Sequence, residues 1–110
     1  MDGELKKLTE DVLAFTQERD WDQFHNPKDL AIALSIEASE LLEAFLWKAP
    51  EDAQHAKVKE ELADVVNYAL LLSDKCGIDL FEAVREKLKK NAEKYPVEKA
   101  KGVAKKYNEL

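Results

Sequence analysis

Two acidic residues interrupt the centre of an apolar helical stripe in residues 36–48, which read IEASELLEAFLWK. At about 100° per residue, Glu37 falls on the same stripe as Leu34 and Leu41, and Glu40 lies about 60° to one side. An ionised carboxylate in an apolar interior is costly unless it is paired or binds a metal ion. The pattern therefore predicts a compensating cation at this place.

A second acidic pair, Glu61 and Asp64, repeats this pattern farther along the chain. The apolar residues on the same helical face as Glu61 are Val58, Val65, Tyr68 and Leu72. If the two helices pack antiparallel through these stripes, four carboxylates converge in a partly buried space. Four like charges at that range either raise one another's pKa values or recruit cations.

The type of ligand indicates which cation this would be. All-oxygen ligation without nearby His or Cys favours Mg²⁺ or Mn²⁺ over zinc or copper, and magnesium held by a few carboxylates keeps open positions for phosphate groups. Di-iron chemistry ranks lower, because it needs Glu-x-x-His pairs inside the stripe and only Asp52 and His55 come near that form. In the competing interpretation, the acids are salt-bridged to lysines inside an interaction bundle.

The elements that position these acids are expected to be helices, because the chain has three Gly, three Pro and few β-branched runs. Four amphipathic helices are expected at residues 4–20, 27–48, 53–75 and from 79 to just before Pro96. Asn26 and Pro27 suit the start of the second helix, and Gly77 suits the end of the third. The prediction is a single all-α domain over residues 1–110, resembling a four-helix bundle.

The faces of the outer helices are also predicted. The residues expected on one face of the first helix are Leu5, Leu8, Val12 and Phe15, and those expected to point inward from the fourth are Val84 and Leu88. Between the first two helices, Trp21, Phe24 and His25 show no helical period. This segment is either a loop tucked over the core or a holder for a flat ligand. Residues 97–110 are expected to form a short helix or an ordered arm.

Composition narrows the class of protein. With 17 basic and 23 acidic residues the net charge is −6, which argues against a general binder of nucleic acid or lipid surfaces. The single cysteine, Cys76, cannot form an internal disulfide, and no apolar run approaches the roughly 20 residues that span a bilayer. With no signal peptide expected either, the chain is predicted to be cytoplasmic, without a membrane or nucleic-acid partner.

Glu37-x-x-Glu40, followed after twenty residues by Glu61-x-x-Asp64, resembles the metal-binding signature of the MazG-type all-α nucleoside triphosphate pyrophosphohydrolases. The flanking segments ERDWDQFHNP, FLWK, EELADVVNY and NAEKYPVEKAKGVAKKYNEL resemble the dCTP pyrophosphatase branch of that family. The similarity extends from about residue 15 to residue 110. It implies hydrolysis of a nucleoside triphosphate, dCTP or a modified pyrimidine deoxynucleotide above all, to the monophosphate and pyrophosphate, as removal of unwanted nucleotides.

The resemblance also implies roles for individual residues. Those that would hold Mg²⁺, or Mn²⁺ in its place, and carry catalysis are Glu37, Glu40, Glu61 and Asp64. Those that would line the base and sugar pocket are Trp21, His25, Trp47 and Tyr68. Those that would approach the phosphates, from this subunit or a neighbouring one, are Lys87, Asn91, Lys94 and Tyr95, and a solvated basic face is the alternative for the lysines. The family fold implies a homo-oligomer, a dimer or a pair of dimers.

Departures from the family pattern leave the base preference open. Ile36 stands where many family sequences carry a further glutamate, although the dCTP pyrophosphatase branch lacks it too. Val12 stands where animal members of that branch have a histidine near the nucleotide. The connection between the second and third helices is also shorter here than in those animal members. Two other functions stay open: a non-enzymatic helical interaction module with structurally paired acids, and a hydrolase of another phosphorylated metabolite on the same metal platform.

Overall fold

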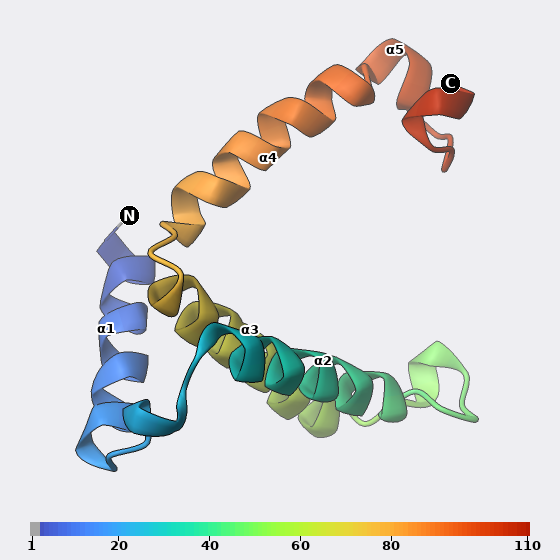
Figure 1. Ribbon diagram of the computed structural model, residues 1–110. Helices are drawn as coiled ribbons and strands as arrows, with labels where there is room; N and C mark the ends of the chain where they lie inside the picture. Colours follow the sequence, from blue (N-terminus) through green and yellow to red (C-terminus); the bar gives the residue numbers. More distant parts are fainter. Residues whose placement is uncertain (1–2) are drawn as a thin grey trace.

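The computed structural model describes residues 3–110, and every regular element in this range is helical. The four long helices are α1 (Gly3–Glu18), α2 (Pro27–Glu43), α3 (His55–Lys75) and α4 (Leu80–Lys94) (Figure 1). The shorter elements are the 3₁₀ turns η1 (Asp22–Phe24), η2 (Pro50–Asp52) and η3 (Tyr107–Glu109) and the one-turn helix α5 (Val97–Ala100). The all-α prediction is confirmed. None of the helices in residues 3–110 is long and apolar enough to cross a membrane.

Local capping signals set several helix ends where the sequence predicts them. Asn26 caps α2 by accepting a hydrogen bond from a first-turn amide at 2.9 Å, and Pro27 is the first helical residue. Gly77 follows α3 with a φ of 65°, the left-handed conformation that glycine adopts at no steric cost. Asp79 caps α4 by accepting a hydrogen bond from the amide of Glu82 at 3.2 Å.

Two helix ends differ from the prediction. The second helix stops at Glu43 rather than Lys48. Its next residues form backbone hydrogen bonds between residues three apart instead of four, and Trp47 has a φ of 61° that no right-handed helix accommodates. The third helix begins at His55 rather than residue 53, because Pro50–Asp52 forms a separate 3₁₀ turn. The acidic residues lie inside the helices in spite of these differences.

The core is built around α3. Antiparallel α2 and α3 lie side by side as the main packed pair, and α1 packs against another side of α3 (Figure 1). Leu30 of α2, Ala44 directly after it, and Leu70 and Leu71 of α3 are buried. Because Leu70 and Leu71 are adjacent, they point about 100° apart, as expected for a helix that is covered on two sides.

The buried face of α1 differs in part from the prediction, since only Leu5 and Val12 of the four residues expected on one face are half-buried. Leu8 and Phe15 are 47% and 48% exposed, whereas Thr9 and Thr16 are buried. The threonine hydroxyls donate hydrogen bonds to carbonyl oxygens of their own helix at 2.7 and 2.9 Å. With their hydrogen bonds satisfied locally, these side chains are inexpensive to bury, and the larger apolar residues are left partly open.

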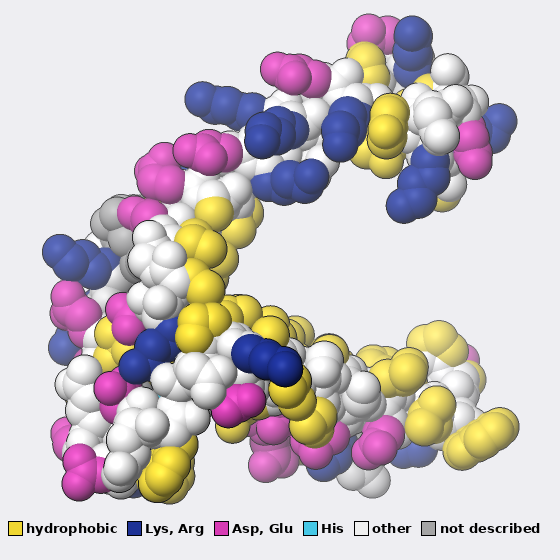
Figure 2. All heavy atoms as spheres, in the orientation of Figure 1, with side chains coloured by type: hydrophobic (Ala, Val, Ile, Leu, Met, Phe, Trp, Pro, Cys, Tyr) yellow, Lys and Arg dark blue, Asp and Glu magenta, His cyan; other side chains and the backbone are white. Residues whose placement is uncertain are grey.

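The helix α4 does not pack into a closed bundle with the other three. It rises away from α2 and α3 as an arm (Figure 1), and the radius of gyration is 17.2 Å, compared with about 13 Å for a compact chain of this length. Val84 and Leu88 are 52% and 55% exposed, so the prediction that they point inward is wrong within one chain. Figure 2 shows hydrophobic side chains along the inner side of the bend and Lys and Arg side chains gathered on the arm.

Candidate functional site

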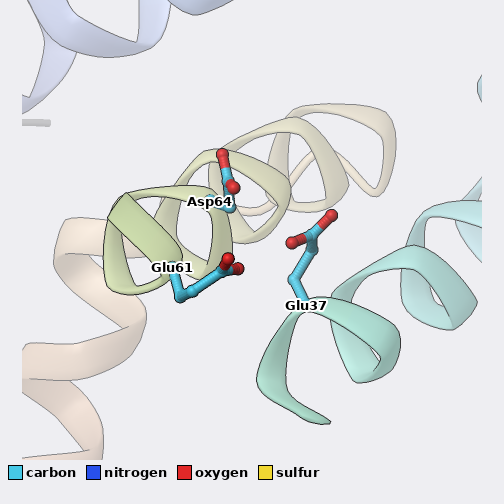
Figure 3. A group of neighbouring side chains, drawn as sticks. All are labelled: Glu37, Glu61 and Asp64. Atoms are coloured by element: carbon cyan, nitrogen blue, oxygen red, sulfur yellow. The ribbon is translucent and has the colours of Figure 1, made fainter. Parts of the chain in front are cut away.

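Three acidic side chains meet between α2 and α3. Glu37 projects from α2 and Glu61 and Asp64 project from α3 into the same space (Figure 3), with one oxygen of each within 4.8 Å of the others. Octahedral Mg²⁺ with ligands at about 2.1 Å places its ligand oxygens about 3 to 4 Å apart. Small side-chain rotations would therefore close these carboxylates on one ion. Glu40, the fourth acid of the predicted set, lies outside this group of three.

The buried oxygens of the cluster lack protein partners. Glu61 is only 5% exposed, and the Oε2 atoms of Glu37 and Glu61 are buried without a hydrogen-bond partner. A buried carboxylate oxygen left unsatisfied costs free energy that a bound cation would offset. The all-carboxylate donor set and these two atoms fit a hard divalent cation.

Electrostatic crowding is strongest at Glu37. Burial raises the pKa of its carboxyl from the usual 4.5 to about 7, and a hydrogen bond to Glu40 adds to the rise. The negative charges of Glu40, Asp64 and Glu61 act in the same direction. A raised pKa, one of the two outcomes predicted for converging acids, is therefore found at Glu37, with burial as its largest cause and the neighbouring acids adding to it.

Neutralisation by lysine applies to only one of the four acids. Lys57 Nζ lies 2.7 Å from Oε1 of Glu61, one helical turn away on α3. Within residues 3–110, no ion pair joins a lysine or arginine to Glu37, Glu40 or Asp64. The cluster therefore keeps an excess of negative charge.

A cavity of about 310 Å³ lies between α1, residues 21–25 (η1 and the residue on either side, called the η1 segment below) and α3. Its lining residues are Asp11, Val12, Phe15, Thr16, Trp21, His25, Asn67, Tyr68 and Leu71. The structure thus brings together Trp21, His25 and Tyr68, three of the four residues expected to line a base pocket. Trp21 and Phe24 are 46% and 67% exposed, so the interpretation of this segment as a loop tucked over the core is wrong.

A second hollow of about 370 Å³ lies beside this cavity, because Val12 and Asn67 line both, and Asp64 is the one acid of the predicted set that lines it. Asn67 forms no side-chain hydrogen bond with any residue in the described part of the chain. Sequence reasoning missed Asn67 and Asp11. The available signal for Asn67 was its position on α3, three residues after Asp64 and beside Tyr68.

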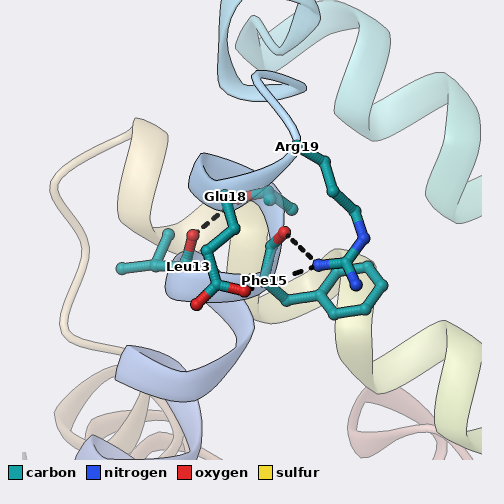
Figure 4. A network of polar contacts seen from close by, with 5 residues as sticks. Leu13, Phe15, Glu18 and Arg19 are labelled. Carbon is teal, nitrogen blue, oxygen red and sulfur yellow. Dashed lines mark hydrogen bonds and ion pairs between the residues drawn. The ribbon is translucent and has the colours of Figure 1, made fainter.

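Contacts around the η1 segment hold the aromatic wall of the cavity. The rings of Phe15 and Trp21 meet edge to face at 5.8 Å. Arg19 covers the Phe15 ring at 3.7 Å and donates a hydrogen bond to the Phe15 carbonyl at 3.0 Å (Figure 4). An ion pair of 2.9 Å between Asp22 and Lys75 fastens η1 to the end of α3. The aromatic segment is thereby tied to the same helix that carries Glu61.

The remaining predicted residues do not join the site within one chain. Trp47 is 99% exposed beyond the end of α2 and lines neither hollow. The four residues expected near the phosphates lie on or directly after α4, which leads away from the acids (Figure 1): Lys87, Asn91, Lys94 and Tyr95. Lys94 and Tyr95 instead lie against Tyr107. The Nζ atom of Lys94 is 5.0 Å from the centroid of the Tyr107 ring, and the ring centroids of Tyr95 and Tyr107 are 6.3 Å apart.

The fold and site define an all-helical protein with a carboxylate cluster shared between two antiparallel helices. The model of the MazG-like family matches residues 32–110, and the chain belongs to this family. It is 40% identical over 104 residues to dCTP pyrophosphatase 1 of Mus musculus and 39% identical to that of Homo sapiens. These alignments cover 87% of the chain and 61% of each relative, so the chain spans about three fifths of their length.

A solved structure agrees with this assignment. The crystal structure of a pyrophosphatase from Archaeoglobus fulgidus matches with a TM-score of 0.79 and 38% identity, covering 87% of this chain and 95% of that one. The resemblance to the dCTP pyrophosphatase branch, inferred from the acidic motif and its flanking segments, is confirmed.

The pKa of Glu37 predicts how the metal-free protein responds to pH. Because its folded-state pKa of about 7 lies above the unfolded value of 4.5, the carboxyl favours folding below pH 4.5, and this contribution is lost as the pH rises through 7. In EDTA, the melting temperature of the wild type should therefore fall as the pH rises from 4.5 to 7. The fall should be smaller in Glu37→Gln, which has no carboxyl to titrate at this position. Glu43→Gln, an exposed acid on the same helix, should keep the wild-type slope. Equal slopes in wild type and Glu37→Gln would contradict the assignment.

Proposed function

We propose that this chain is a Mg²⁺-dependent nucleoside triphosphate pyrophosphohydrolase that cleaves dCTP or a modified pyrimidine deoxynucleotide to the monophosphate and pyrophosphate. The observation that carries the proposal is a cluster of one buried and two half-buried carboxylates, with two unsatisfied buried oxygens, near an aromatic cavity. The names of the relatives, dCTP pyrophosphatase 1 and an archaeal pyrophosphatase, support it. We place the reaction in the cytoplasm, where the exposed Cys76 thiol stays reduced.

The residues that would hold Mg²⁺, or Mn²⁺ in its place, are Glu37, Glu61 and Asp64, with Glu40 at the edge of the site. A bound divalent ion would neutralise phosphate oxygens and acidify a water molecule. One carboxylate of the cluster orients the attacking water and accepts its proton. The water oxygen then forms a bond to the α-phosphorus while the bond to the pyrophosphate leaving group breaks.

The aromatic cavity would hold the base. Its volume of about 310 Å³ suits one nucleobase with part of the sugar, and Trp21 and Tyr68 supply flat surfaces for contact with the ring. The Asn67 amide carries both a donor and an acceptor, so it can pair with the exocyclic groups of a pyrimidine. Both Asn67 and Asp64 line the second hollow, so we expect the phosphates to extend along it toward the acids.

A homo-oligomer, a dimer or a pair of dimers, would complete the site. The inner side of the bend presents apolar side chains (Figure 2), and Val84 and Leu88 of α4 are exposed. A second copy of the chain would cover such apolar surface. In such an assembly, the basic residues of one α4 can approach the acidic cluster of a neighbour. We propose this arrangement for Lys87 and Lys94, which lie away from the cluster of their own chain, and for the exposed Trp47.

Substitution of the most buried acid tests the reaction. Glu61→Gln should lower Mg²⁺-dependent release of pyrophosphate from dCTP by about a hundredfold or more, because a neutral amide replaces a charged metal ligand. The far-ultraviolet circular dichroism spectrum should retain its helical shape. Glu60→Gln, the exposed neighbour, should be near wild type. Wild-type activity in Glu61→Gln would count decisively against the proposed metal site.

A second experiment tests the base pocket. Trp21→Ala should weaken binding of the non-hydrolysable α,β-imido analogue of dCTP by about tenfold, because base stacking contributes about 1–3 kcal/mol. Isothermal titration calorimetry in the presence of Mg²⁺ measures the dissociation constant. Phe24→Ala is the matched control, because Phe24 belongs to the same segment, is 67% exposed and does not line the cavity. Equal affinities in the two variants would exclude Trp21 from the pocket.

Light scattering coupled to size-exclusion chromatography tests the assembly. The wild type should have a mass of two or four times the 12.5 kDa chain, and Leu88→Glu should shift it toward the monomer, because a charge replaces an apolar contact. Glu86→Ala, an exposed change on the same helix, should leave the mass unchanged. A monomeric wild type would rule out the proposed assembly.

A further inference from the structure

The acidic cluster contains one built-in cation. Lys57 Nζ lies 2.7 Å from Oε1 of Glu61, and the two residues are one turn apart on α3. The Glu61 side chain is 6% exposed, whereas that of Lys57 is 51% exposed. The ammonium group therefore reaches in from solvent to neutralise a carboxylate that belongs to the buried site.

This ammonium neutralises only part of the cluster. The other oxygen of Glu61, Oε2, and Oε2 of Glu37 remain buried without partners, so the pair with Lys57 leaves these acceptors unsatisfied. Within residues 3–110, Lys57 is the only lysine or arginine that forms an ion pair with any of the four acids. Its half-exposed side chain is free on the solvent side, so it can leave Glu61 without disturbing the packing of α2 and α3.

Lys57 and a divalent cation compete for the same carboxylate. A dication bound to Glu61 repels an ammonium held at hydrogen-bond distance from that carboxylate and draws its negative charge away, so metal binding weakens the ion pair and favours a lysine turned toward solvent. With free metal, Lys57 loses its hydrogen-bonded partner and keeps only the weaker electrostatic attraction of Glu60 and Glu40. When the metal arrives with a triphosphate, the phosphate oxygens supply new negative charge for the released ammonium.

We propose that Lys57 is a positioning residue that holds Glu61 in the metal-free site and gives up that carboxylate when a divalent cation arrives. This inference rests on the proposed function, because it takes the cluster to be a metal site. The exchange of Lys57 for a metal ion at Glu61 makes the site bind free Mg²⁺ weakly and the metal–triphosphate complex tightly. The two ligands are thereby coupled, and the nucleotide brings the metal into the site.

Isothermal titration calorimetry of the full chain tests this exchange without measuring turnover. The variants are Lys57→Met, which keeps the length and removes the charge, and Lys57→Arg, which keeps the charge. Lys59→Met is the matched control, because Lys59 is exposed on the same helix and forms no ion pair with a described residue. The probes are Mg²⁺ alone and the α,β-imido analogue of dCTP at saturating Mg²⁺.

Lys57→Met should bind free Mg²⁺ at least about fivefold more tightly than the wild type and bind the analogue at least about fivefold more weakly. Lys57→Arg and Lys59→Met should resemble the wild type in both titrations. A purely structural lysine would not change the two affinities in opposite directions. Unchanged or weaker Mg²⁺ binding in Lys57→Met would overturn the exchange while leaving the proposed function intact. A wild type that binds no Mg²⁺ in either titration would overturn both.

Discussion

The burial of ionisable carboxylates between α2 and α3 is the constraint on which the rest of this structure depends. These two helices form the main packed pair, yet the centre of their contact holds acids instead of hydrocarbon, with Glu61 only 5% exposed. Such an arrangement costs folding free energy unless a cation compensates for it. Apolar residues on either side of the acids supply the burial that offsets this cost: Leu30 on α2, Ala44 directly after α2 and Leu70 on α3.

Much of the fold could be predicted because its signals are local. The residues around Asn26 and Gly77 specify helix ends by backbone chemistry that needs no tertiary partner. Burial on the outer helices could not be predicted in the same way. Thr9 can be buried at little cost because its hydroxyl is satisfied within its own helix, and Leu88 is exposed because α4 extends away from α2 and α3 as an arm. Amphipathic spacing alone does not say which chain supplies the covering surface.

The candidate site was predictable to the extent that it follows helical period. Glu37 and Glu61 were expected to converge because each interrupts an apolar stripe, and packing of α2 on α3 brings them together. Asn67 was missed, because the cavity that it lines forms only when α1 and the η1 segment close over α3. The pairing of Lys57 with Glu61 was also missed, although their spacing of four residues is visible in the sequence. A spacing of that kind is common, and only burial of the acid makes it informative.

One helix, α3, carries acidic residues of the cluster, the inner wall of the aromatic cavity and the lysine that anchors the η1 segment. Asp64 and Tyr68 are four residues apart, so about 6 Å of helix axis separates the two parts of the site. A straight helix is stiff over that length, and movement of α4 or of a neighbouring copy cannot change the interval. The helix therefore fixes the distance that any bound molecule must span between the acidic cluster and the aromatic cavity.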